Sequence, residues 1–113
     1  MGRIQNETCI KFVPRNYEKH YIYINNMPKA GCYAVIGYHW NANKPHPVNL
    51  ETPGCMKHQG TIEHELLHII GLYHEQSRSD RDEHVYIYWG NITDGRYGIY
   101  NFRKYFSVYF CVG

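Results

Sequence analysis

The sequence predicts an α+β domain in which short strands precede one central helix. Three runs in the first forty residues are rich in β-branched and aromatic side chains, as strands are. After Gly60 the spacing of the apolar residues changes to that of a helix. Because the 113 residues contain no linker and no internal repeat, we expect one domain over residues 1–113.

The predicted strands in the first half of the chain are CIKFV at 9–13, HYIYI at 20–24 and CYAVIGY at 32–38. NANKPHP at 41–47 holds two prolines and is expected to be a loop. VNLE at 48–51 alternates apolar and polar residues, which is typical of an edge strand.

The central helix is expected to begin at Thr61, whose hydroxyl can cap the first turn. Gly71 is the expected stop, because glycine tolerates the left-handed conformation that ends many helices. Beyond it, residues 76–84 form a charged connection, and VYIYW at 85–89 again alternates like a strand. The apolar positions that recur at helical spacing are Ile62, Leu66, Leu67, Ile69 and Ile70.

The charge pattern predicts neither a nucleic-acid nor a membrane partner. The net charge is only +2 and the lysines and arginines are scattered, so no basic groove or polybasic patch is expected. No apolar run approaches the roughly 20 residues of a membrane-spanning helix. The first nine residues, MGRIQNETC, lack the apolar core of a signal peptide. The oligomeric state is not predicted.

Cysteine number and spacing favour an oxidising compartment. The four cysteines form no CxxC pair, which disfavours a cysteine zinc ribbon or a redox motif. Two disulfides fit better, although reduced buried cysteines remain an alternative. Asn6 and Asn91 begin glycosylation sequons, which are common by chance and do not show that either is modified.

The stretch HELLHIIGLYH at 64–74 has the pattern of a metal site. His64 and His68 are four residues apart, so on a helix they share one face and can bind one ion. A turn at Gly71 would bring a third imidazole, from His74, to the same ion. Three histidines leave tetrahedral zinc one open position, as in catalytic sites. We expect four other histidines to be solvated: His20, His39, His46 and His84.

Glu65 follows the first of these histidines and would reach a zinc-bound water rather than the metal. There it would act as general base, taking the proton of the water and passing it to the leaving amine. The competing interpretation is a buried helix whose histidines make local hydrogen bonds. HExxH alone is a weak pattern, but the added glycine and third histidine make coincidence far less frequent.

HExxHxxGxxH is the signature of the metzincin zinc peptidases. The next residues, EQSRSDRDEHVYIYWGNI at 75–92, resemble the continuation found in the astacin family. The similarity to astacin segments extends from about residue 7 to residue 105, whereas residues 106–113 match nothing that we recognise. The other similar segments are TCIKFVPR at 8–15, GCYAVIGY at 31–38, GCMKHQGTIEHELLH at 54–68 and NFRKY at 101–105.

The resemblance implies a secreted, extracellular zinc metalloendopeptidase that cleaves peptides and proteins. It implies a zincin-like subdomain, with a twisted mixed sheet and a central active-site helix. It also implies one Zn²⁺ per chain on His64, His68 and His74, with Glu65 as general base. VNLE would be the edge strand that pairs with extended substrate. The family pattern points to a disulfide between Cys32 and Cys55.

Two further implications concern Glu75 and Cys9. In the family the residue that matches Glu75 helps to anchor the mature N-terminus, and the alternative here is an exposed carboxylate in a charged loop. Cys9 would pair with a cysteine near the end of a full domain, and in this chain either Cys111 replaces that partner or both stay free.

The chain also departs from the family pattern, and we therefore expect a partial domain that lacks most of the C-terminal subdomain. The family begins with a further strand and a long helix, and it has a methionine turn after the third histidine. The methionines here are Met1, Met27 and Met56, all before the helix. An inactive remnant that binds zinc or peptide is therefore the alternative to an active enzyme, and substrate specificity is not predicted.

Overall fold

The computed structural model describes residues 1–38, 45–92 and 96–105. The chain divides into two compact units, Met1–Leu72 and Tyr73–Gly113, which we describe separately. The predicted loop at 41–47 and the tail at 106–113 fall wholly or partly outside the described residues, as do His39 and Cys111.

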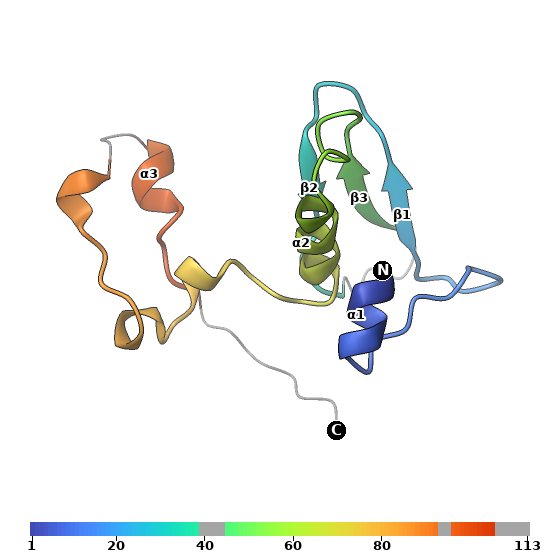
Figure 1. The fold of residues 1–113 in the computed structure, drawn as a ribbon, viewed down its shortest axis with the longest axis horizontal. Coiled ribbons are helices and arrows are strands. Elements are labelled where there is room, and N and C mark those ends of the chain that lie inside the picture. Colours follow the sequence, from blue (N-terminus) through green and yellow to red (C-terminus); the bar gives the residue numbers. More distant parts are fainter. Residues whose placement is uncertain (39–44, 93–95, 106–113) are drawn as a thin grey trace. The chain divides into compact units, whose positions relative to one another are not determined.

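The first unit holds a three-stranded sheet formed by β1 (Ile22–Asn25), β2 (Cys32–Ala34) and β3 (His46–Leu50) (Figure 1). The strand order is β1-β3-β2, with β3 parallel to β1 and antiparallel to β2. A mixed sheet with helices confirms the predicted α+β class.

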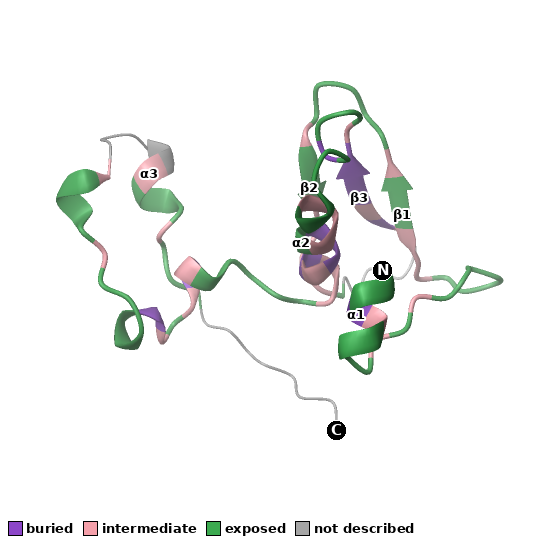
Figure 2. Ribbon diagram, in the orientation of Figure 1, coloured by how far each residue is buried: buried purple, intermediate pink, exposed green. Residues whose placement is uncertain are grey.

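The prediction that VNLE is an edge strand is wrong. Val48, Asn49 and Leu50 belong to β3, which lies between the other two strands and is buried along this stretch (Figure 2). The alternation misled because Asn49, although polar, is fully buried and satisfied by hydrogen bonds to the turn before β2. Within the described part of the chain, β1 and β2 are the two edges of this sheet.

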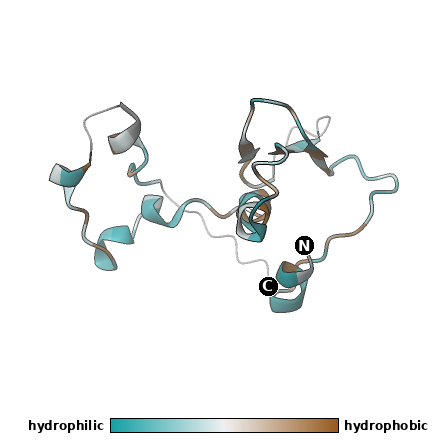
Figure 3. Ribbon diagram, turned by 45° about the horizontal axis from the view of Figure 1, so that its top comes forward, coloured by the Kyte–Doolittle hydropathy of each residue, from teal (hydrophilic) through white to brown (hydrophobic). Residues whose placement is uncertain are grey.

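The central helix α2 spans Gln59–Ile69 and packs on β2 and β3. It begins two residues before Thr61, with His58 at the N-cap and no side-chain cap, so the predicted threonine cap is wrong. The Thr61 N–H instead bonds to the His58 carbonyl. Apolar residues of α2, of the sheet (Figure 3) and of the segment between β3 and α2 form the core: Val48, Leu50 and Cys55, with Ile22, Ala34, Ile62 and Ile69 against them.

The segment before the sheet differs from the prediction. Residues 9–13 are not a strand, and a short helix, α1 (Gly2–Glu7), precedes them. The side-chain oxygen of Gln5 accepts a hydrogen bond from the Phe12 N–H. The main-chain carbonyl of Gln5 accepts one from the Lys11 ammonium. The bond to Gln5 thus occupies the Phe12 N–H, a main-chain group that a strand would need for a neighbouring strand. The predicted strands at 20–24 and 32–38 are confirmed only as β1 and the shorter β2.

The described residues of the second unit form 3₁₀ turns at Glu75–Ser77, Arg81–Glu83 and Trp89–Asn91, and helix α3 (Arg96–Tyr100). Residues 85–88 form no strand in the structure, so the predicted strand at 85–89 is wrong. An alternating pattern indicates a strand only where another strand can pair with it.

The prediction that four histidines are solvated is only partly confirmed. His84 is exposed and His20 is half-buried, whereas His46 is buried as the first residue of β3. The His46 N–H bonds to the Tyr21 carbonyl, so pairing with the chain before β1 draws this residue into the sheet.

Candidate metal centre

Helix α2 presents His64, Glu65 and His68 in one and a half turns. His64 is exposed, while Glu65 and His68 are 5% and 8% exposed. The two imidazole rings meet edge to face, with centroids 4.5 Å apart. Spacing of four residues thus places both imidazoles on one face, as the sequence predicted.

The C-terminus of α2 is closed by main-chain hydrogen bonds. The Leu72 N–H bonds to the Leu67 carbonyl over 3.1 Å, and the Gly71 N–H bonds to the His68 carbonyl over 2.9 Å. This pair of bonds is a Schellman motif, in which the residue after the C-cap is left-handed. Gly71 has φ +102° and follows the C-cap Ile70, so it ends the helix as predicted.

The turn at Gly71 brings the third histidine to the first two. One potential ligand atom each from His64, His68 and His74 lies within 4.8 Å of the others. Imidazole nitrogens around tetrahedral zinc are about 3.3 Å apart, given Zn–N bonds of about 2.0–2.1 Å. The three side chains can therefore reach a single ion with small rotations.

A main-chain carbonyl orients the His68 ring. Its Nδ1 lies 2.7 Å from the Leu72 carbonyl oxygen, which requires a proton on Nδ1 and leaves Nε2 as the atom that could bind a metal. Ligand histidines commonly donate their second nitrogen in this way, which sets the tautomer and the ring orientation. The same turn therefore closes the helix and orients a candidate ligand.

Glu65 lies between His64 and His68 in α2, and its side chain is buried. Its Oε2 atom is inaccessible to solvent and has no hydrogen-bond partner among the residues that the structure describes. A buried carboxylate oxygen without a partner costs free energy, so such an oxygen indicates a functional demand. The helix thus holds a buried potential proton acceptor at the residue after His64.

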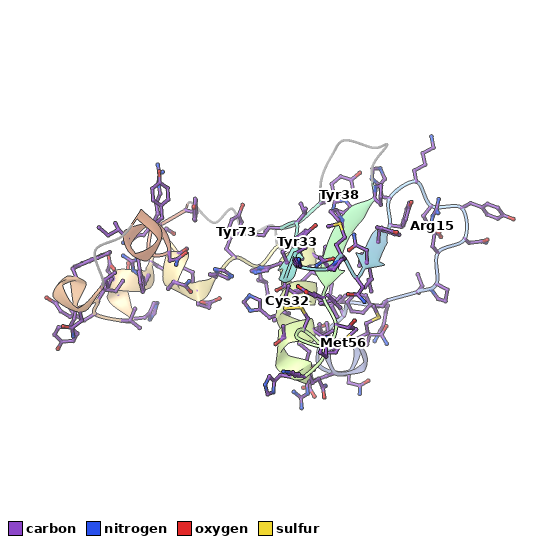
Figure 4. The ribbon with its side chains drawn as sticks, turned by 90° about the horizontal axis from the view of Figure 1, so that it is seen from above. Arg15, Cys32, Tyr33, Tyr38, Met56 and Tyr73 are labelled. Carbon is purple, nitrogen blue, oxygen red and sulfur yellow. A yellow bond between two sulfur atoms is a disulfide. The ribbon has the colours of Figure 1, made fainter. Side chains whose placement is uncertain are left out.

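Strand β2 is linked to the segment before this helix at one end and to the helix itself past its other end. Cys32 forms a disulfide with Cys55, as the family resemblance implied, and Figure 4 labels Cys32 and Tyr33 on the strand. Past the other end, the Gly37 N–H donates to the His68 carbonyl over 2.8 Å. Cys9 is exposed and free, and its suggested partner Cys111 is not described.

The acidic residues after the third histidine form ion pairs on the surface. Glu75 is exposed and accepts from Arg78 over 3.1 Å. Arg78 also donates two hydrogen bonds to Asp80, which lower the pKa of that carboxyl to about 2. The pKa of the Asp82 carboxyl is also lowered, mostly by its hydrogen bond from the Lys104 ammonium and next by its hydrogen bond from Arg81.

Sequence reasoning missed three residues that support the site: Gly37, Asn49 and Glu51. In the sequence, Gly37 lies within a predicted strand, and Asn49 and Glu51 are the polar positions of VNLE. The partners of Asn49 and Glu51 lie 18 to 22 residues away along the chain, so no local pattern marks them.

Comparison with known families decides the lineage. Residues 1–109 match the model of the astacin peptidase family. The chain belongs to the astacin family. This confirms the resemblance inferred from the zinc signature and the residues after it.

Individual relatives agree with this assignment. The low choriolytic enzyme of Oryzias latipes is 47% identical over 92 residues, which are 81% of this chain and 32% of the relative. Zinc metalloproteinase nas-4 of Caenorhabditis elegans is 41% identical over 95 residues, 84% of this chain and 29% of the relative. Both relatives are therefore much longer than this chain.

A solved structure shares the fold. High choriolytic enzyme 1, a hatching enzyme zinc-protease from the medaka fish Oryzias latipes, superposes with a TM-score of 0.69 at 40% identity, covering 90% of this chain and 47% of that structure. This chain spans about a third of the length of the curated relatives above. No helix in the described part of this astacin-family chain is long and apolar enough to cross a membrane.

Proposed function

We propose that this chain carries the zinc-binding half of a secreted metalloendopeptidase and hydrolyses peptide bonds in peptides or proteins. The observation that carries the proposal is the cluster of His64, His68 and His74 beside the buried, unpartnered oxygen of Glu65. Zinc metalloproteinases among the relatives support the metal, and the Cys32–Cys55 disulfide supports an oxidising, extracellular location.

One zinc ion per chain fits the donor set. Among the described residues, the imidazoles of His64, His68 and His74 form a group of three potential metal ligands. Neutral imidazole suits zinc, and three protein ligands leave a position for water or substrate. Zinc, when bound, supplies a Lewis acid that polarises the scissile carbonyl and makes water more acidic.

Glu65 is proposed to move the proton. Its buried carboxylate accepts a proton from the attacking water and returns it to the leaving amine, so one residue serves as base and then as acid. Burial keeps the carboxylate close to the reacting atoms and away from competing bulk water.

The substrate is proposed to pair with β2 instead of VNLE. Cys32 and Ala34 face β3 residues in register, and the bond from the Val35 N–H to the Pro47 carbonyl identifies the next pair as hydrogen-bonded. Because bonded and non-bonded pairs alternate in an antiparallel ladder, the N–H and C=O groups of Cys32 and Ala34 point to the outer edge. An extended peptide can add there as a further strand.

The test is zinc-dependent cleavage of a quenched-peptide library by this chain, next to Glu65→Gln and a chelator control. Glu63→Gln is the matched control, since Glu63 lies on the same helix but pairs with Arg3 and Gln59 on the outside. Activity lost with Glu65→Gln and chelator, and kept in Glu63→Gln, supports the proposal. Wild-type protein that binds one zinc but cleaves nothing would instead show the inactive, zinc-binding form.

A further inference from the structure

The turn that leads into β2 has an unfavourable backbone conformation. Lys29 has φ +60° and Gly31 has φ +69°. Within the described residues, Lys29 is the residue other than glycine with a positive φ. A side chain with a Cβ is disfavoured in this region, so the conformation persists only where neighbouring groups hold it.

The carboxylate of Glu51 holds this turn. The Lys29 N–H donates to Oε1 over 2.9 Å, and the Gly31 N–H donates to Oε2 over 2.8 Å. These two main-chain bonds, that of Lys29 first, lower the pKa of the Glu51 carboxyl. Left-handed residues of this kind turn their N–H groups toward one side, where they bind an anion.

Asn49, a residue of β3, holds the same turn from the buried side. The Asn49 side chain accepts the Met27 N–H over 2.8 Å and donates to the Gly31 carbonyl over 2.6 Å. Asn49 is also the register partner of Tyr33 in β2. The hydrogen bonds to Asn49 and Glu51 therefore fix the turn up to Gly31, immediately before β2 begins.

We propose that Glu51 is a positioning residue for substrate, because it sets the direction in which β2 leaves the turn. This rests on the proposed function, in which the outward N–H and C=O groups of Cys32 and Ala34 bind the peptide main chain. The disulfide holds the Cys32 side chain, but the peptide planes of Gly31 and Cys32 follow from the turn. Without the carboxylate, Lys29 relaxes toward a negative φ and these planes rotate.

The experiment compares Glu51→Gln with Glu18→Gln in the zinc-loaded chain. Glu18 is a matched control, because its exposed carboxylate also accepts a backbone N–H, from Asn16, and also has a lowered pKa. We expect Glu51→Gln to raise KM about fivefold, the order for one lost net hydrogen bond, with kcat changed less than about twofold. Glu18→Gln is expected to match the wild type.

A modified substrate separates positioning from general damage. A peptide N-methylated at the amides that face β2 cannot form the strand bonds, so its KM should be the same with and without Glu51→Gln. An equal loss on both peptides would mean that Glu51 only stabilises the fold, and the proposal would be wrong. An unchanged KM for the ordinary peptide would overturn it as well.

Rescue gives a second, independent readout. Lys29→Gly removes the Cβ that makes φ +60° unfavourable, so the double variant Glu51→Gln with Lys29→Gly should recover most of the wild-type KM. Amide shifts of Lys29, Gly31 and Cys32 should move in Glu51→Gln and partly return in the double variant. Failure of the rescue in a folded protein would contradict the proposal.

The two proposals fail in different ways. If the wild type cleaves peptides and Glu51→Gln behaves identically, only the positioning role is lost. If the zinc-loaded wild type neither cleaves nor binds peptide, the proposed function and the role of Glu51 fall together.

Discussion

The N–H of Gly37 donates to the carbonyl of His68 over 2.8 Å, joining the chain after β2 to the last turn of the histidine-bearing helix. A Cβ on Gly37 would lie 3.6 Å from the Cα of Gly71, which is ordinary contact. Its φ of +68°, rather than lack of space, therefore makes glycine the suitable residue here.

Gly37→Ala is expected to lower the free energy of unfolding by about 1–2 kcal/mol, the cost of a left-handed residue with a Cβ. It should also weaken zinc binding, because the His68 carbonyl loses a donor at its correct position. Urea unfolding and a zinc competition titration measure the two effects. Gly60→Ala, in α2 with open space around the new Cβ, should change stability by less than about 1 kcal/mol.

Zinc removal is expected to destabilise the protein by mass action. At a free zinc concentration of about 100 Kd, binding adds about 2.7 kcal/mol to the free energy of unfolding. Calorimetry should show the Tm fall by roughly 10 °C when a chelator is added. His64→Ala removes a ligand at an exposed position, so its Tm should not respond to zinc or chelator. A wild-type Tm that ignores zinc would contradict the metal site.

Loss of the disulfide should reduce stability through the unfolded state. Cys32 and Cys55 are 23 residues apart, and a cross-link over such a loop stabilises by about 3 kcal/mol. Cys32→Ala with Cys55→Ala should lower the urea midpoint accordingly. The comparison is Cys9→Ser, which changes a free, exposed thiol and should shift stability by no more than about 0.5 kcal/mol.

Arg81 is expected to stabilise the second unit. It is buried and donates to the carbonyls of Gln76 and Phe102 and to the Asp82 carboxylate. Arg81→Met would leave both carbonyls unpaired, at a cost of about 2–3 kcal/mol. Amide exchange near Phe102 should accelerate. Arg103→Met, at an exposed neighbour, should leave that exchange unchanged.

The Asp80–Arg78 pair predicts a stability change at acid pH. Asp80 has a folded-state pKa of about 2, below its ordinary value of 3.8, because Arg78 bonds to its charged form. Its stabilising contribution is therefore complete above pH 3.8 and is lost as the pH falls through 2. The urea midpoints of wild type and Asp80→Asn should differ at about pH 5 and converge near pH 2.

Local features of the fold could be predicted from the sequence. The stop at Gly71 follows from the preference of one residue and from bonds to carbonyls within the preceding helical turn. The shared face of His64 and His68 follows from helix geometry alone. For these features the relevant partners are close in sequence, so a pattern in a short window contains the information.

Long-range features could not be predicted in the same way. VNLE alternates as an edge strand would, but strand order depends on β1 and β2, which lie far from it along the chain. Asn49 looked like an outward polar residue and is buried, because its hydrogen-bond partners come from the turn at residues 27–31. Thr61 resembled a cap, yet the helix extends two residues further without any side-chain cap.

The closure of α2 by main-chain groups has a consequence for variation among such proteins. The bonds from Gly71 and Leu72, and the one that orients His68, involve no side chain at positions 69, 70, 72 or 73. The exposed side chains of Leu72 and Tyr73 can therefore change while the helix closure stays, provided that residue 72 keeps its N–H. Ile69 is constrained for another reason, because it packs against the core. An insertion or deletion of one residue between His68 and His74 would instead turn the third imidazole away. Length is thus a strict requirement of this stretch, whereas the exposed side chains at positions 72 and 73 are ones that a designer of new specificities could vary.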